Sequence, residues 1–290
     1  QIKGRVMTIV NPGPWVDYEA VEAEVWKSQL GIIKLIEFPV RNPKMSRRAF
    51  HLYWQKHHSP HVMNLTSFAQ FIRKYNSGHA QNRPLEQLPD RYIQETSYEG
   101  ASELWLDGLE ELEKWFGQPI YEDLIHHDEQ RFLSQEGEGA FMLTREERLY
   151  EPDIDMDENL KTKVYLLLKG KAESSYQSLH AGASEHGRLI LAQPTLKAYL
   201  RKVAISHALI PPHPEGIELS DVDVVFEFWF DDVESAEQFF QQEDYRTVIM
   251  DHESSCFDVS LAKIVAAKMR VVHDEFSFQP SVTQPLPFNL

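Results

Sequence analysis

The residues best suited to chemistry begin on one predicted helix, over residues 47–58. Phe50, Trp54 and His58 are four residues apart, so they share one helix face, and the two large apolar side chains should turn that face inward. A histidine carried to the same side can change its charge near neutral pH, which suits general acid–base catalysis. The alternative is that His58 only caps the end of the helix.

A second polar group follows at the end of a predicted strand over residues 67–76. Tyr75, Asn76 and His79 lie there, close in sequence to the end of the helix. We expect Tyr75 to assist His58 in moving a proton, and Asn76 and His79 to position a substrate oxygen. The alternative is that Tyr75 and Asn76 make ordinary hydrogen bonds at a strand end.

Alternation along the strands divides the remaining candidates. Phe71 and Arg73 share one side with Tyr75, and on the predicted strand 101–107 Glu103 and Trp105 share the side that should face the interior of a barrel. A carboxylate in such a place needs a base, for example Arg73, or its pKa rises. Phe71 and Trp105 would then hold the substrate. Asp107 is expected to be the N-cap of the next helix.

Two histidine-rich stretches, 57–61 and 126–129, invite a metal interpretation. Neighbouring helix residues point about 100° apart, and no H-E-x-x-H spacing exists, so we expect no metal ion. The one cysteine, Cys256, cannot form an internal disulfide and is interpreted as a packing residue. No organic cofactor is expected either.

The chain carries one pattern twice, with the later copy 124 residues downstream. Ten residues of the first copy return, namely Glu103, Trp105, Asp107, Glu110, Glu113, Phe116, Gln118, Tyr121, Ile125 and Glu129, as Glu227, Trp229, Asp231, Glu234, Glu237, Phe240, Gln242, Tyr245, Ile249 and Glu253. An upstream series returns 128 residues later and includes His58 as His186. A period this long indicates a duplicated domain, because solenoid units are much shorter.

The two copies differ where chemistry is expected. Four polar or aromatic candidates of the first copy are replaced in the second by small or apolar residues: Tyr53, Trp54, Tyr75 and Asn76 correspond to Ala181, Gly182, Val203 and Ala204. Any site should therefore belong to the first copy. Retention of His58 as His186 instead favours a structural duty for this histidine.

Each copy predicts the order strand, helix, strand, strand, helix, strand, which is typical of an α+β ferredoxin-like unit. Such a sheet leaves one face bare, so we expect the two units to pack sheet to sheet and enclose one intramolecular barrel. The predicted elements are strands at 31–38, 67–76, 101–107, 140–150, 163–169, 193–205, 223–232 and 263–272, and helices at 47–58, 109–133, 173–185 and 233–257. The predicted divisions are an extension with one strand and one helix (1–30), the first domain (31–150), an acidic linker (151–161), the second domain (162–274) and an arm (275–290).

The segment Phe50-x-x-Tyr53-Trp54-x-x-x-His58-x-Pro60 resembles the signature of the EthD family, in the dimeric α+β barrel superfamily. Later matches follow in order: Tyr75, Asn76 and His79, then Glu103 to Asp107, then Pro119, Asp128, Glu129 and Phe132. The second copy matches only the later motifs. The resemblance implies tandem ferredoxin-like barrel domains, a degenerate second copy, and small-molecule degradation, cyclisation, dehydration or oxygenation, often without metal or organic cofactor.

From these residues and this resemblance we expect a cofactor-independent lyase, dehydratase or cyclase that acts on a small aromatic or polyketide-like molecule. His58 and Tyr75 would be catalytic, and the substrate would contact Tyr53, Trp54, Phe71, Arg73, Asn76, His79, Glu103 and Trp105. The alternatives are a non-catalytic small-ligand-binding or scaffold protein, and a cofactor-free oxygenase in which a phenolic carbanion reacts with oxygen directly. Related barrels bind haem, but no feature here singles out an axial histidine.

The composition of the chain argues against two classes of binding partner. A net charge of −16 argues against nucleic acid and against an anionic membrane surface, because both attract basic proteins. No run of 18 apolar residues exists, and the first residues show no secretion signal. We expect a cytoplasmic protein that takes a small-molecule substrate, and assembly into a homodimer stays open. Because residue 1 is Gln rather than a start methionine, the earlier removal of a presequence stays an open alternative.

Overall fold

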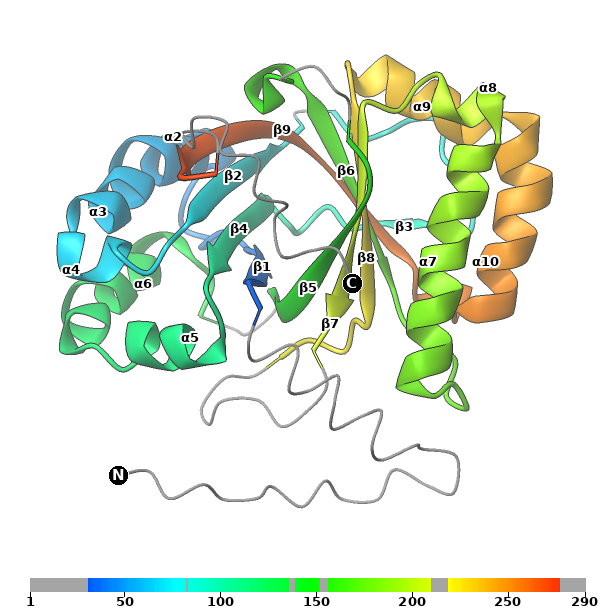
Figure 1. Ribbon diagram of the computed structural model, residues 1–290. Helices are drawn as coiled ribbons and strands as arrows, with labels where there is room; N and C mark the ends of the chain where they lie inside the picture. Colours follow the sequence, from blue (N-terminus) through cyan, green and yellow to red (C-terminus); the bar gives the residue numbers. More distant parts are fainter. Residues whose placement is uncertain (1–30, 82, 136–138, 152–155, 210–218, 277–290) are drawn as a thin grey trace.

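The computed structural model describes residues 31–81, 83–135, 139–151, 156–209 and 219–276. Figure 1 shows these residues as a central barrel with helices on two opposite sides. The extension 1–30, with its predicted strand and helix, and all but the first two residues of the arm 275–290 lie outside the described residues. No described helix is both long and apolar enough to cross a membrane.

The first half forms a four-stranded antiparallel sheet in the order β2-β4-β1-β5. Its strands are β1 (Ile33–Phe38), β2 (Lys74–Ala80), β4 (Gly100–Leu106) and β5 (Ala140–Tyr150). Its outer face is covered by α2 (Arg47–Tyr53), a π-helical turn (Trp54–His58), α3 (Ser59–Asn64), α4 (Thr66–Ala69), α5 (Leu109–Phe116), a second π-helical turn (Tyr121–His126) and α6 (His127–Phe132).

The second half repeats this arrangement, with the strand order β7-β8-β6-β9. Its strands are β6 (Thr162–Leu168), β7 (Lys202–Ala208), β8 (Val224–Phe230) and β9 (Lys263–Asp274). Its helices are α7 (Tyr176–Ala192), α8 (Pro194–Lys197), α9 (Val233–Gln241), a π-helical turn (Tyr245–Ile249) and α10 (Met250–Cys256). Short β3 (Ile93–Gln94) runs parallel to β9, and 3₁₀ turns span Glu158–Leu160 and Val259–Leu261.

The two sheets close into one barrel through two equivalent junctions. β5 pairs with β7, and β9 pairs with β2, so each junction joins the last strand of one half to the second core strand of the other. This is the arrangement that two separate units would have in a dimer, achieved here within one chain. The predicted fold class, with tandem ferredoxin-like units and an intramolecular barrel, is therefore confirmed.

Both faces of the sheet are buried, with different chemistry on each. In β4, Leu104 and Leu106 pack under the helices of the first half, while Glu103 and Trp105 point into the barrel, as alternation predicts. An apolar cluster fills much of the barrel interior and includes Phe38, Met142, Tyr165, Val265 and Met269. The barrel is thus a packed core over this length.

The predicted strand 67–76 is wrong over most of its length, because β2 begins only at Lys74. The preceding residues form the single turn α4, in which the amides of Phe68 and Ala69 donate to the carbonyl of Leu65. Phe68 and Ile72 are four residues apart and fully buried, which is helical rather than strand spacing. The same error occurs in the second half, where α8 precedes β7.

The long helix predicted over 109–133 is interrupted once, at residues 117–118, and residues 119–132 continue as a second helical segment that contains the π-helical turn. Gly117 ends α5, and Pro119, which has no amide hydrogen to donate, lies between α5 and the next turn. The predicted N-cap at Asp107 is also wrong: Gly108 occupies that position, and the carboxylate of Asp107 accepts hydrogen bonds from Arg73. The predicted helix 233–257 is likewise divided, with α9 ending at Gln241.

Candidate functional site

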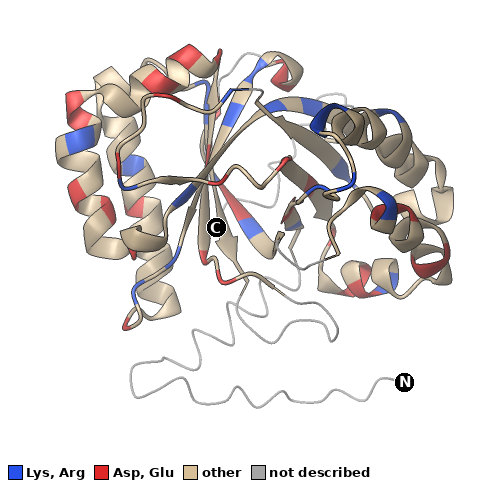
Figure 2. Cartoon of the chain, turned by 180° about the vertical axis from the view of Figure 1, so that it is seen from behind, with Lys and Arg blue, Asp and Glu red and all other residues tan. Residues whose placement is uncertain are grey.

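A group of buried charges lies at the centre of the barrel. Lys34 Nζ lies 2.7 Å from Glu103 Oε1 and 2.6 Å from Glu227 Oε2, and Lys163 Nζ lies 2.6 and 2.5 Å from the same two carboxylates. Burial raises the pKa of Glu103, but Lys163 and Lys34 outweigh burial and hold it at about 2. The prediction that Arg73 pairs with Glu103 is wrong, since the basic partners of Glu103 are Lys34 of β1 and Lys163 of β6. Figure 2 shows charged positions on the barrel strands as well as on the helices.

Two other candidates share this interior. The Trp105 ring lies 4.7 Å from Lys34 Nζ and 5.4 Å from Lys74 Nζ, in cation–π geometry. Asn76 Nδ2 donates to Glu158 Oε2 at 3.3 Å. Asn76, Glu103 and Trp105 therefore belong to the filled barrel, on the opposite side of the sheet from the helices.

Arg73 and Phe71 lie apart from both the buried charges in the barrel and the polar residues between the sheet and the helices. Arg73 donates to Asp107 from Nε at 2.9 Å and to Glu275 from Nη1 at 2.9 Å, just before the start of β2. Phe71 is half-buried against the apolar layer between sheet and helices. The structure thus does not bring Phe71, Arg73 and Trp105 together around one pocket.

Tyr75 faces the helices rather than the barrel. Its hydroxyl accepts a hydrogen bond from Trp54 Nε1 at 3.3 Å and lies 3.1 Å from Ser59 Oγ. Burial raises the pKa of Tyr75, although these hydrogen bonds oppose the rise. Because consecutive strand residues point to opposite faces, Tyr75 and Asn76 are separated by the sheet.

His79 belongs to a second polar chain on the same outer face. Its Nδ1 lies 3.0 Å from His51 Nδ1, its ring centroid lies 4.7 Å from that of Trp54, and His51 Nε2 lies 3.2 Å from Glu99 Oε2. Burial, with help from His51 and Arg270, lowers the pKa of His79 to about 4. His79 is therefore neutral near pH 7 and exchanges hydrogen bonds rather than carrying charge.

The most distinctive array joins Tyr53, His58 and Asp128. Asp128 Oδ2 lies 2.9 Å from His58 Nδ1, and Asp128 Oδ1 accepts from the Tyr53 hydroxyl at 2.5 Å. Tyr53 and His58 are five residues apart, and the π-helical turn between them, with its i→i+5 spacing, places both side chains over the same carboxylate. His58 and Asp128 are each 8% exposed.

The hydrogen bonds of this array set the charge of Asp128. Burial raises the pKa of Asp128, but the hydrogen bonds from His58 and Tyr53 outweigh it and hold that pKa below its ordinary value. An ionised Asp128 keeps the proton of a neutral His58 on Nδ1 and leaves Nε2 as the basic atom.

Asp128 is the residue that sequence reasoning missed. It was considered only as a motif match and as part of a metal-like stretch. The available signal was the repeat itself, because the equivalent residue 124 positions later is His252. In the second half, His186 Nδ1 lies 3.2 Å from His252 Nδ1, and Ala181 stands where Tyr53 would be. The carboxylate nearest His186 is that of Glu253, 3.7 Å from Nε2, so the Tyr53–Asp128–His58 arrangement is not repeated there.

A cleft of about 520 Å³ opens beside the array, between the first π-helical turn with α3 and the second π-helical turn with α6. Tyr53 and Asp128 line it, together with His57, His61 and Arg131. His58 lies behind Asp128, and its ring packs 4.8 Å from that of Phe132. Among the described residues, no cluster of three His, Cys, Asp or Glu side chains could hold a metal ion.

Comparison with known families identifies the chain. The family model described as "EthD domain" matches residues 42–136 and 176–260, one match in each half. The chain therefore belongs to the EthD family, with two tandem copies of the domain. Comparison with curated proteins finds no match.

Solved structures share the fold at low identity. An anthrone oxidase-like protein superposes with a TM-score of 0.54 at 10% identity, covering 87% of this chain and 97% of its own. A putative monooxygenase from Lactobacillus acidophilus NCFM gives 0.47 at 8% identity, with 84% and 96% covered. A variant of chlorite dismutase from Candidatus Nitrospira defluvii gives 0.40 at 12% identity, with 87% and 95% covered.

The first of these similarities corrects one expectation. The expected lyase, dehydratase or cyclase was wrong, because the structure that superposes with a TM-score of 0.54 carries the name of an anthrone oxidase-like protein. The alternative of a cofactor-free oxygenase agrees better with this name. At 10% identity this superposition shows the fold alone, so the chemistry must be argued from the residues of this chain.

Proposed function

We propose that this protein oxidises a small, electron-rich aromatic molecule with molecular oxygen, and that His58 is the base that starts the reaction. The observation that carries the proposal is the Tyr53–Asp128–His58 array beside a cleft, whose tyrosine and aspartate are replaced by Ala181 and His252 in the other half. A base oriented by a buried carboxylate is a recurring device for proton abstraction.

The proposed reaction needs only a base and oxygen. The substrate enters through the cleft and reaches past Asp128 to His58, whose Nε2 removes a proton from an acidic ring CH₂ of an anthrone-type ketone. The resulting carbanion gives its electrons to O₂ and forms a C–O bond. Protonation of the peroxide and loss of water leave a new C=O, so that one CH₂ and one O₂ become one C=O and one H₂O. In this sequence the carbon is oxidised by four electrons and O₂ is reduced by four.

The cleft suits the anion that such a step creates. Lys56, Arg131 and the imidazoles of His57 and His61 line it beside the carboxylates of Asp123 and Asp128, so cationic and hydrogen-bond-donating groups are within the cleft where negative charge would develop. Donors fixed in a protein stabilise a developing oxyanion without having to reorganise. Tyr53 stays on Asp128 and keeps that carboxylate in place.

The test uses anthrone as a probe and measures oxygen uptake and quinone absorbance with purified, chelator-treated protein. We expect one O₂ consumed per quinone formed, at a rate above the reaction without protein. His58→Ala should lower turnover by roughly 10²–10⁴-fold, and His186→Ala, its counterpart in the other half, should leave turnover within about twofold. Binding of anthrone without oxygen uptake, or equal losses in the two variants, would reject this function.

A further inference from the structure

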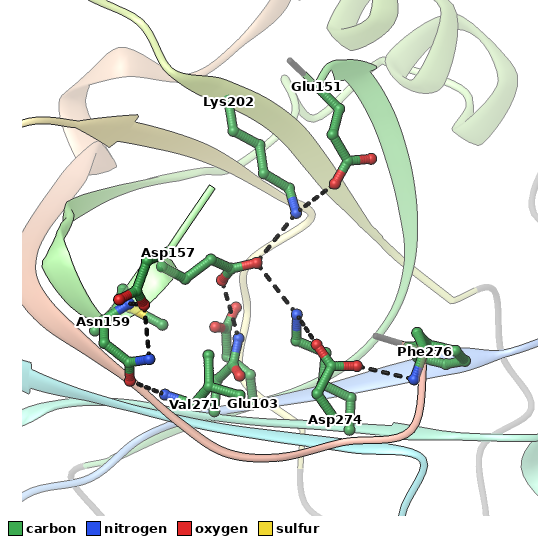
Figure 3. Close-up of polar contacts among 12 residues, drawn as sticks. Glu103, Glu151, Asp157, Asn159, Lys202, Val271, Asp274 and Phe276 are labelled. Carbon is green, nitrogen blue, oxygen red and sulfur yellow. Dashed lines mark hydrogen bonds and ion pairs between the residues drawn. The ribbon is translucent and has the colours of Figure 1, made fainter. Parts of the chain in front are cut away.

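One end of the barrel is closed by a carboxylate from the segment that joins the two halves. The 3₁₀ turn Glu158–Leu160 begins after Asp157, whose side chain accepts from the amide of Asn159 at 3.0 Å. Asn159 Oδ1 in turn accepts from the amide of Val271 at 2.8 Å. These contacts hold the turn against β9, and Figure 3 shows Asp157, Asn159 and Val271 in this arrangement. Glu158 follows Asp157 in the turn, is 9% exposed and contacts side chains of β2 and β7.

The Glu158 carboxylate is surrounded by donors from both halves. Its Oε1 accepts from Lys74 Nζ at 3.2 Å and from Lys202 Nζ at 3.3 Å, and its Oε2 accepts from Asn76 Nδ2 at 3.3 Å. The two lysines are equivalent residues of the duplicated halves, on β2 and β7. Lys74, Asn76 and Lys202, called here the barrel mouth, are each more than nine-tenths buried.

In each half, the lysine of the barrel mouth lies close to the ring of an equivalent tryptophan. Lys74 lies 5.4 Å from the ring of Trp105, and Lys202 lies 5.0 Å from the ring of Trp229, the equivalent tryptophan. One carboxylate thus sits between two matched lysine–tryptophan pairs. No second copy of Glu158 is needed, because a single anion can serve both lysines at once.

Glu158 is the carboxylate that Lys74 and Lys202 share at the barrel mouth. Without Glu158, Lys74 would keep Asp274 at 3.1 Å, and Lys202 would keep Glu151 at 3.0 Å, which is half exposed at the rim. Burial raises the pKa of Glu158, but Lys202 and Lys74 outweigh burial and hold it at about 2. Removing one partner from such a buried set leaves a poorly compensated charge, which is strongly destabilising.

We propose that the barrel mouth is a carboxylate-binding site, that Glu158 occupies it as a tethered ligand, and that the site takes a small free carboxylate when this side chain is removed. Tethering gives Glu158 a high effective concentration, so millimolar acetate does not displace it from the intact protein. The linker therefore fastens the two halves across this end of the barrel. This inference is independent of the reaction proposed for the cleft.

The experiment is chemical rescue of Glu158→Ala, followed by thermal unfolding. We expect the variant to melt roughly 5–15 °C below the intact protein. Acetate, titrated to 100 mM against chloride at constant ionic strength, should raise the Tm of the variant in a saturable way and leave the intact protein within about 1 °C. Glu151→Ala, which removes the rim partner of Lys202, should show a small Tm change and no saturable acetate effect.

Two further variants keep the proposal decidable. Glu158→Ala combined with Lys202→Met should lose the acetate response, because the truncated site then has one cation. Glu158→Gln should melt between the intact protein and Glu158→Ala and should not respond to acetate, since its amide fills the site. If Glu158→Ala folds only when acetate is present, the proposal is supported. An unchanged Tm for Glu158→Ala, an equal response to acetate and chloride, or failure of acetate to restore folding would overturn it.

Discussion

Replacing Asp128 with asparagine should remove the base while keeping the shape of the site. The carboxylate lies 2.9 Å from His58 Nδ1 and holds the proton there. An asparagine amide that donates to Nδ1 would move the ring proton to Nε2, so the atom proposed to take the substrate proton would no longer be basic.

The size of the effect follows from the geometry. Coulomb's law with an effective dielectric constant of about 20 gives roughly 5 kcal/mol between unit charges at this separation. About half of that, 2–3 kcal/mol, applies when the imidazolium charge is half developed in the transition state, which corresponds to roughly a 10²-fold loss of kcat/KM. Both side chains are only one-tenth exposed, so solvent screens this interaction weakly.

The assay is oxygen uptake with anthrone across pH 5–9, with His252→Asn as the matched control at the equivalent position of the other half. We expect Asp128→Asn to lose activity at every pH and His252→Asn to retain it. Activity of Asp128→Asn above about one third of the intact protein, with an unchanged pH profile, would show that Asp128 does not orient a catalytic base.

Three further predictions concern other contacts. Tyr53→Phe removes one hydrogen bond to Asp128 and should lower kcat/KM by roughly three- to tenfold while costing about 0.5–1.5 kcal/mol in urea unfolding; no change in either quantity would contradict this. Glu103→Gln should destabilise the fold by about 3–5 kcal/mol, whereas Glu110→Gln, on an exposed helix, should cost about 0.5 kcal/mol or less; comparable losses would be inconsistent with the buried network. Burial, with the charge of Glu37, raises the pKa of Glu129 to about 8, so the stability that its protonated form provides is lost as pH rises from about 4.3 towards 8. Glu129→Gln should therefore raise Tm relative to the intact protein at pH 8 but not at pH 4, and an equal gap at both pH values would refute this.

The repeat made the fold predictable, and the limits of the prediction have physical causes. Residues that alternate or recur with a fixed offset, such as Glu103 and Glu227, reveal strand faces and the duplicated unit without any coordinates. The lysine partners of these carboxylates could not be found in this way, because the pairs cross between β1, β4, β6 and β8. Burial of two lysines depends on tertiary packing that no local pattern encodes.

The candidate site could be predicted only in part, because its geometry also depends on structure that the local sequence pattern does not show. His58 was identified from its helix face, but that face assumed an α-helix, and the π-helical turn brings Tyr53 to the same carboxylate instead. Tyr75 and Asn76 looked alike because both are lost in the second half, yet they lie on opposite faces of β2. The roles predicted for Tyr75 and His79 remain predictions.

The most direct test of the proposed function is the origin of the oxygen atom in the product. The intact protein would convert anthrone under ¹⁸O₂. The ¹⁸O content of the quinone would be measured by mass spectrometry at early times, before its carbonyl exchanges oxygen with water. We expect one labelled oxygen per quinone, with labelled quinone formed roughly 10²–10⁴-fold more slowly by His58→Ala and at nearly the intact rate by His186→Ala. A quinone that carries only unlabelled oxygen, or that forms equally fast without the protein, would contradict it.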